Sequence, residues 1–151
     1  MNRLYATGTG VPADRSRAEI EKTLTRYGAT GFIYGWEGLR ALVAFQMNAR
    51  RIKFLLPMPD KAEVGKTRTG RKRRGAAVEM AHQQEVRRRW RALALAVKAK
   101  LEVVASGIVG FDEEFMPYIV MPDGKTVAEH VSPSIAEAYQ GGKMKALLPK
   151  F

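Results

Sequence analysis

The sequence predicts one α+β domain over residues 16–151, in which helices flank a short antiparallel sheet. Apolar residues recur at helical spacing near the N-terminus and again in the middle of the chain. Between these stretches, residues 30–59 are rich in aromatic and β-branched side chains and alternate with the period of two that is typical of strands. A chain of 151 residues has room for one such domain with a sizeable core.

The first helix is predicted over residues 17–27. Residues 1–15, which precede it, are polar and rich in glycine, so we expect an extended or mobile arm there. Ser16 and Glu19 have the spacing of a capping box, and Gly28 suits the left-handed position that ends many helices. Ile20, Leu24 and Tyr27 form one apolar stripe along this helix.

An antiparallel meander of three strands is expected next. Glu37-Gly38 and Asn48-Ala49 are the two predicted turns, and Pro57 and Pro59 end the third strand because neither can donate to a ladder. The residues predicted to alternate onto one face are Ala41, Val43, Phe45 and Met47 in the second strand and Ile52, Phe54 and Leu56 in the third.

A basic loop over residues 60–75 leads into a long amphipathic helix, which is predicted from Ala76 to near Gly107. This helix is expected to pack on the sheet through Val86, Trp90, Leu93, Val97, Leu101 and Val104. A small helical part then completes the chain. Its signals are a cap at Asp112 and two capping boxes, Thr126 with Glu129 and Ser134 with Glu137. Pro133 lies between the boxes and is expected to break or kink the path there.

Positive charge is the strongest functional signal in the sequence. The net charge is +11, and residues 61–91 hold eleven Lys or Arg against three acidic residues, a local balance of 11 − 3 = +8. A surface of this kind attracts a polyanion, and a bound phosphate backbone would release counterions. The residues expected to contact phosphates are Lys66, Arg68, Arg71, Lys72, Arg73 and Arg74 in the loop, and Arg87, Arg88 and Arg91 on the helix. The alternative is a solvated, disordered loop whose charge only aids solubility.

Aromatic residues of the first strand offer a second feature. Phe32, Tyr34 and Trp36 fall on one face of that strand, where they could stack unpaired bases. A core face covered by the long helix is the favoured interpretation, because a meander needs an apolar face to pack. Tyr34 and Trp36 are therefore candidate stacking residues only if that face is open.

Several other classes of site find little support. The chain has no Cys, which excludes disulfides and thiolate chemistry, and its two His lack metal-ligand spacing, so neither a metal nor a cofactor is expected. No secretory signal or membrane-spanning run is visible, which favours a cytoplasmic setting and no membrane partner. The only carboxylate cluster is formed by Asp112, Glu113 and Glu114.

Three stretches together resemble a family of small uncharacterised phage and prophage proteins. They are RAEIEKTLTRYGATGFIYGW (17–36), RRRWRALALAVKAKLEVVASGI (87–108) and IVMPDGKTVAEHV (119–131). The resemblance implies a phage context and carries no activity or site residue with it. In order of elements alone, the predicted meander and long helix are similar to the core of RAD52-type single-strand annealing proteins.

The function expected from these features is non-catalytic binding of nucleic acid, with single-stranded DNA in phage recombination or replication favoured. One alternative is a protein-interaction module, a host-factor inhibitor or assembly factor whose basic loop meets an acidic surface. A third is a small metal-dependent nuclease that uses the carboxylates of residues 112–114. An exposed edge of the meander would also allow a homo-oligomer.

Overall fold

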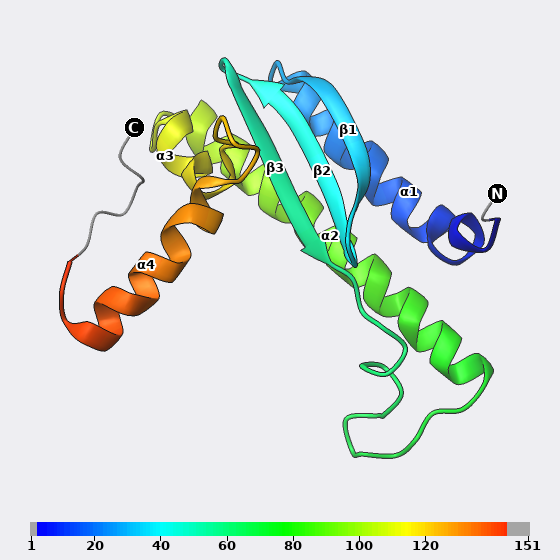
Figure 1. Ribbon diagram of the computed structural model, residues 1–151. Helices are drawn as coiled ribbons and strands as arrows, with labels where there is room; N and C mark the ends of the chain where they lie inside the picture. The colour runs from blue at the N-terminus through cyan, green and yellow to red at the C-terminus, as the bar shows by residue number, and fades with distance from the viewer. Residues whose placement is uncertain (1–2, 145–151) are drawn as a thin grey trace.

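The computed structural model describes residues 3–144, with side chains from residue 13 onward, and it confirms the α+β fold. A three-stranded sheet and two long helices form two layers, and a smaller helical part lies beside the third strand (Figure 1). The elements in chain order are α1 (Arg3–Arg26), β1 (Thr30–Glu37), β2 (Arg40–Met47), β3 (Arg50–Pro57), α2 (Ala76–Ala105), α3 (Phe111–Phe115), the 3-10 helix η1 (Met116–Tyr118) and α4 (Val127–Gly141).

The sheet is the expected antiparallel meander, with strand order β1-β2-β3. Asn48 and Ala49 both have positive φ, 51° and 58°, as a two-residue hairpin turn that matches the strand twist requires. At the other hairpin the residues between the strands are Gly38 and Leu39, one position later than predicted, and Gly38 supplies the positive φ of 62°.

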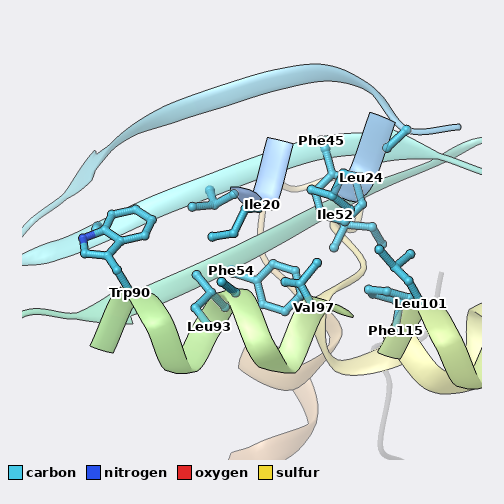
Figure 2. Packing of buried hydrophobic residues seen from close by; sticks show 14 of the residues in the cluster. Ile20, Leu24, Phe45, Ile52, Phe54, Trp90, Leu93, Val97, Leu101 and Phe115 are labelled. Carbon is cyan, nitrogen blue, oxygen red and sulfur yellow. The ribbon is translucent and has the colours of Figure 1, made fainter. Parts of the chain in front are cut away.

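One face of the sheet forms the core with both long helices. Figure 2 shows side chains of α1 and α2 meeting those of β2 and β3. The predicted alternation is confirmed on this face, because Ala41, Val43, Phe45, Ile52 and Phe54 are all buried. The helices contribute Ala13, Ile20 and Leu24 from α1, and Val86, Trp90, Leu93, Ala94, Val97 and Leu101 from α2.

Helix α1 is longer than predicted. The expected arm over residues 1–15 lies only partly within the described residues, and from Arg3 onward the backbone is helical instead of extended. Ser16 is therefore inside the helix and does not cap it. The apolar stripe already includes Ala13, which is seven residues before Ile20 and only 2% exposed. Because the Ala13 side chain is small, the sequence pattern did not mark this position as part of the stripe.

The C-terminal part attaches to the free edge of β3. Ile119 forms an antiparallel bridge with Ile52, and the Val120 backbone N–H donates to the Arg51 carbonyl at 2.8 Å. Phe115 is fully buried and stacks edge-on against Phe45 at 6.4 Å between ring centroids. These contacts fix α3 and η1 to the sheet.

Helix α4 begins with the predicted capping box and differs from the prediction further along. The Glu129 backbone N–H donates to the Thr126 hydroxyl, and the Thr126 N–H donates to the Glu129 carboxylate at 2.7 Å. The second expected box, Ser134 with Glu137, starts no helix, because α4 continues through Pro133 to Gly141. Proline removes one backbone donor, yet the helix runs without a break to Gly141.

Replacing Phe115 by Ala should lower the free energy of unfolding by about 3–5 kcal/mol, because it leaves a cavity between α3 and the sheet. The measurement is the urea midpoint of the full chain. Leu39→Ala is the matched control, since that side chain is 81% exposed and its loss should change the midpoint little. Equal effects of the two substitutions would contradict this account of the core.

Candidate nucleic-acid interface

The basic loop between β3 and α2 contains a small hairpin. Lys66 and Lys72 form an antiparallel bridge, and the Thr67 N–H donates to the Arg71 carbonyl at 2.8 Å. At the tip, the Gly70 N–H donates to the Thr67 carbonyl at 2.9 Å, and Gly70 adopts a φ of 85° that other residues rarely reach. The backbone of this segment thus has internal hydrogen-bond partners, although its sequence has no strand pattern.

Arg73 closes the base of the hairpin from within. Its guanidinium Nη1 donates to the carbonyl of Val64 at 2.8 Å and to that of Lys66 at 3.0 Å. Its backbone N–H donates to the Gly65 carbonyl at 2.8 Å. Arg73 is therefore a positioning residue that links both sides of the hairpin, which differs from the phosphate contact predicted for it.

Further contacts join the loop to the β3 end of the sheet and to α2. The His82 ring Nε2 lies 3.0 Å from the Pro59 carbonyl oxygen, and the Lys61 ammonium pairs with Glu79 at 3.0 Å. Arg89 donates to the Pro57 carbonyl at 2.8 Å and pairs with Glu63 at 3.0 Å. The acidic residues closest in sequence to the loop are thereby used at its base.

Five cations remain on the outside of the loop. Lys66 and Lys72 face each other across the bridge, an arrangement of like charges that destabilises an isolated hairpin. A bound polyanion would remove this repulsion. Among the residues that the structure describes, no acidic side chain forms an ion pair with any of these exposed cations, which are Lys66, Arg68, Arg71, Lys72 and Arg74.

The predicted cations of α2 form a separate patch and do not continue the loop surface. The loop contacts the flank of α2 that carries His82 and Arg89. Arg87 and Arg91 are exposed and lie two positions on either side of Arg89, so helical geometry turns them about 160° away from it. Arg88 is occupied by a bidentate pair with Glu85 at 2.6 and 2.8 Å.

Glu85 is the most strongly perturbed carboxylate of this region. It accepts hydrogen bonds from Arg88 and from the Arg89 Nε, the latter at 2.9 Å. The two Arg88 hydrogen bonds, followed by the one from Arg89, lower the pKa of Glu85 from 4.5 to about 2, although partial burial acts in the opposite direction. Glu85 thus stays ionised and offsets part of the local positive charge.

Phe32 and Tyr34 of β1 pack against the core, but α1 covers Tyr34, where the favoured interpretation expected the long helix. The Tyr34 hydroxyl donates to the Arg17 carbonyl at 3.1 Å, and the Arg17 guanidinium lies over the rings of Tyr34 and Trp90 at 5.0 and 5.9 Å. Burial is the main cause that raises the pKa of Tyr34 to about 12. Trp36 is 44% exposed at the rim of a cavity of about 160 Å³ that Tyr34 and Trp90 also line. Tyr34 is thus unsuited to stacking a base, whereas Trp36 is partly accessible.

The carboxylates of residues 112–114 do not converge on one point. Asp112 pairs with Arg50 at 3.0 Å, and Glu114 pairs with Lys100 at 3.2 Å. In the described part of the chain, no three His, Asp or Glu side chains gather where they could hold a metal ion.

Comparisons of the chain with protein-family models, with curated proteins and with solved structures give no match. Among residues 3–144, no helix combines the length and the apolar content that crossing a bilayer requires.

Arg73 donates three hydrogen bonds to backbone carbonyls, two of them from its side chain. Replacing Arg73 by Met removes those two bonds and should therefore open the hairpin. Amide hydrogen exchange of residues 65–73 should become at least several-fold faster. Arg71→Met removes the same charge from an exposed side chain and is the matched control. Equal protection of the loop in both variants would show that Arg73 does not position it.

Replacing Glu85 by Gln should reduce the pH dependence of stability on the acid side. A carboxylate whose pKa is lowered by folding stabilises the native state above its unfolded pKa, and this contribution is lost as pH falls through the folded pKa. The contribution of Glu85 should therefore decline between pH 4.5 and about 2. The measurement is the urea midpoint across that range, with Glu102→Gln as the control on the same helix. A Glu85→Gln profile that runs parallel to that of the wild type would contradict the assignment.

Proposed function

We propose that this protein is a non-catalytic nucleic-acid-binding protein whose primary contact is the basic hairpin, and that single-stranded DNA is its favoured ligand. The observation that carries the proposal is the exposure of five cations on one short hairpin with no acidic partner among the described residues. A phosphate backbone is the polyanion that such a closely spaced set of charges fits.

The preference for a single strand rests on the placement of the second patch. Arg87 and Arg91 lie on a flank of α2 different from the one that receives the loop. A flexible single strand can pass from the hairpin around the helix to these residues, whereas a duplex is stiff over about 150 base pairs. Trp36 is exposed, whereas Phe32 and Tyr34 of the same strand are half-buried, so binding should depend on phosphates more than on base identity.

The proposed setting is phage recombination or replication, where single-stranded DNA must be bound without being cut. This setting rests on the sequence resemblance alone. A protein-interaction module that uses the loop against an acidic surface is the second candidate. Exposed apolar side chains of α4, Ile135 and Tyr139, favour interaction with some protein, and this helix lies apart from the loop (Figure 1).

The test replaces Arg68, Arg71, Lys72 and Arg74 by Gln and retains the positioning residue Arg73. Binding of a labelled oligothymidine is measured by anisotropy over a range of salt concentrations. We expect a large loss of affinity, and we expect the slope of log affinity against log salt to flatten by about 0.7 for each phosphate contact removed. Duplex DNA and single-stranded RNA of equal length are the comparison ligands.

The matched control removes four exposed cations of the helical layer, Arg15, Lys22, Arg26 and Lys98, again to Gln. Both variants carry the same net charge, so a nonspecific effect of charge would weaken them equally. Equal losses would refute the hairpin as the site. A wild-type chain with no affinity for any of the three nucleic acids at physiological salt would support the protein-interaction alternative.

A further inference from the structure

A small open cavity lies at the end of the core where β1 and β2 join. Its volume is about 160 Å³, and both tryptophans of the chain line it, Trp36 from β1 and Trp90 from α2. Trp36 faces the helices because it pairs across the strands with the buried Ala41, which also lines the cavity. In Figure 2, Trp90 lies at one end of the row of buried side chains. The core therefore ends in an opening between two indole rings.

The walls of the cavity suit a flat ring that carries hydrogen-bond acceptors. The Arg17 guanidinium lines it and lies over the rings of Tyr34 and Trp90. One nitrogen of Arg17 lies 3.5 Å from the exposed Asp14, and a guanidinium has further N–H donors. These donors can bond a carbonyl oxygen of a ligand. None of the residues that line the cavity is acidic, so nothing in its walls repels such an oxygen.

The size of the cavity selects a ligand with a single ring. A protein cavity of about 150 Å³ accommodates benzene, so a volume of about 160 Å³ holds one six-membered ring. The two fused rings of a purine exceed this space. Trp36, at the rim and 44% exposed, offers a face on which the ring can stack. A pyrimidine base combines one flat ring with a carbonyl acceptor.

A cation lies beside the cavity at the distance of a nucleotide phosphate. Arg87 precedes Trp90 by three residues on α2, so the Cβ atoms of the two residues are about 5–6 Å apart. Arg87 is exposed, whereas Trp90 is buried. A nucleotide whose base enters beside Trp90 can therefore place its phosphate against Arg87. This arrangement gives the helical patch of cations a role of its own.

The cavity is also within reach of a strand held by the basic hairpin. Trp36, Ala41 and Leu56 stand in one row across the sheet. Pro57, the last residue of β3, follows Leu56 directly, and the basic loop begins after it. Three strands span about 10 Å, so the loop leaves the sheet about that far from Trp36. A few nucleotides cover this distance.

We propose that the cavity is a subsite for one pyrimidine nucleotide. The base stacks on Trp36, a carbonyl oxygen of the base accepts from Arg17, and the phosphate contacts Arg87. The subsite rests on the proposed function where the nucleotide belongs to a bound single strand. A free pyrimidine nucleotide carries the same ring and the same phosphate, and the experiment separates these two sources.

The experiment uses the full chain and its own tryptophan fluorescence, which reports on the cavity because both tryptophans line it. Thymidine monophosphate should quench this fluorescence to saturation, and deoxyadenosine monophosphate should not. Anisotropy of labelled strands should show that oligothymidine binds at least about five-fold more tightly than oligodeoxyadenosine of equal length, the gain from one additional stacked base.

Ala13→Leu fills the cavity without removing a ring or a charge, since Ala13 lines it and is 2% exposed. This variant should lose the response to thymidine monophosphate and the preference for oligothymidine, and it should bind oligodeoxyadenosine as wild type does. Trp36→Leu removes the stacking surface and should lose the same preference. Circular dichroism checks folding, and Trp36→Leu decides the comparison if Ala13→Leu does not fold.

Arg87→Gln should weaken binding of thymidine monophosphate several-fold, while Arg15→Gln, which removes the same charge from an exposed position of α1, should not. The variant with four Gln in the hairpin should lose affinity for both oligonucleotides and retain the response to thymidine monophosphate. The hairpin and the subsite are thereby tested separately.

A wild type whose fluorescence does not respond to thymidine monophosphate would overturn the subsite. So would a preference for oligothymidine that persists in both cavity variants, which would assign that preference to strand flexibility. A wild type that binds thymidine monophosphate and no oligonucleotide would overturn the proposed function and establish the cavity as a site for a free pyrimidine nucleotide.

Discussion

The placement of positive charge in this protein depends on the hydrogen bonds that the Arg73 side chain makes. The guanidinium of the half-buried Arg73 donates to the carbonyls of Val64 and Lys66, and these contacts hold the hairpin closed. With this residue turned inward, its neighbours of the same charge are turned outward. Hydrogen bonds from Arg73 to backbone carbonyls therefore shape the candidate interface, while Glu63 and Glu79 pair with Arg89 and Lys61 at the base of the loop.

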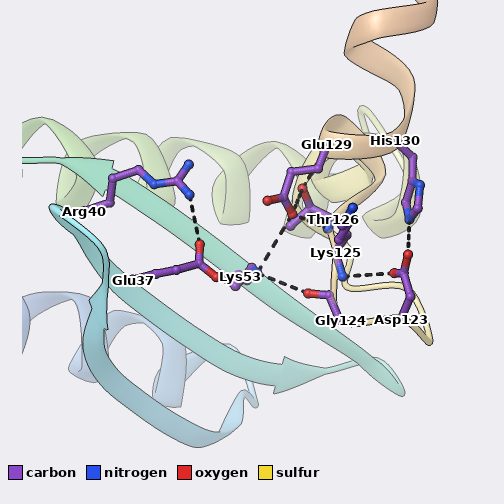
Figure 3. A network of polar contacts seen from close by, with 9 residues as sticks. All are labelled: Glu37, Arg40, Lys53, Asp123, Gly124, Lys125, Thr126, Glu129 and His130. Carbon is purple, nitrogen blue, oxygen red and sulfur yellow. Dashed lines mark hydrogen bonds and ion pairs between the residues drawn. The ribbon is translucent and has the colours of Figure 1, made fainter.

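The two-layer core determines where that hairpin stands. Strand β3 and helix α2 both belong to the core, and the loop connects the end of one to the start of the other. The first turns of α2 extend beyond the sheet, so the loop lies at one end of the molecule and not over the sheet (Figure 1). The helical C-terminal part occupies the opposite end of β3, where α4 is anchored through Lys53 (Figure 3). The basic hairpin and the helical C-terminal part are thus separated by the core itself.

Elements with a strong period could be predicted from sequence, and contacts made by individual polar side chains could not. The meander and α2 follow from alternation and from a stripe of large apolar residues, and both are confirmed. The start of α1 was missed because its stripe continues through Ala13, a side chain too small to mark a buried position. The extent of α4 was misjudged because the general tendency of proline to interrupt helices was applied to Pro133, whereas α4 continues through it.

Within the candidate site, the sequence predicted the cluster of cations and nothing in it distinguished their roles. Arg73 and Arg89 read like their neighbours, yet one closes the hairpin and the other joins the loop to α2 through Pro57 and Glu63. A run of Lys and Arg has no periodicity from which inward and outward side chains could be separated. The division of the cations into two patches likewise follows from which flank of α2 receives the loop, a long-range property of the fold.

The most direct measurement of the central claim is a map of the contact surface on the full chain. Backbone amide chemical shifts are recorded while a short single-stranded oligonucleotide is added. The account predicts the largest changes in residues 65–74, smaller changes around Arg87 and Arg91, and little change in residues 18–26 or in α4. Changes confined to α1, α4 or the outer sheet face, with the hairpin unaffected, would contradict it.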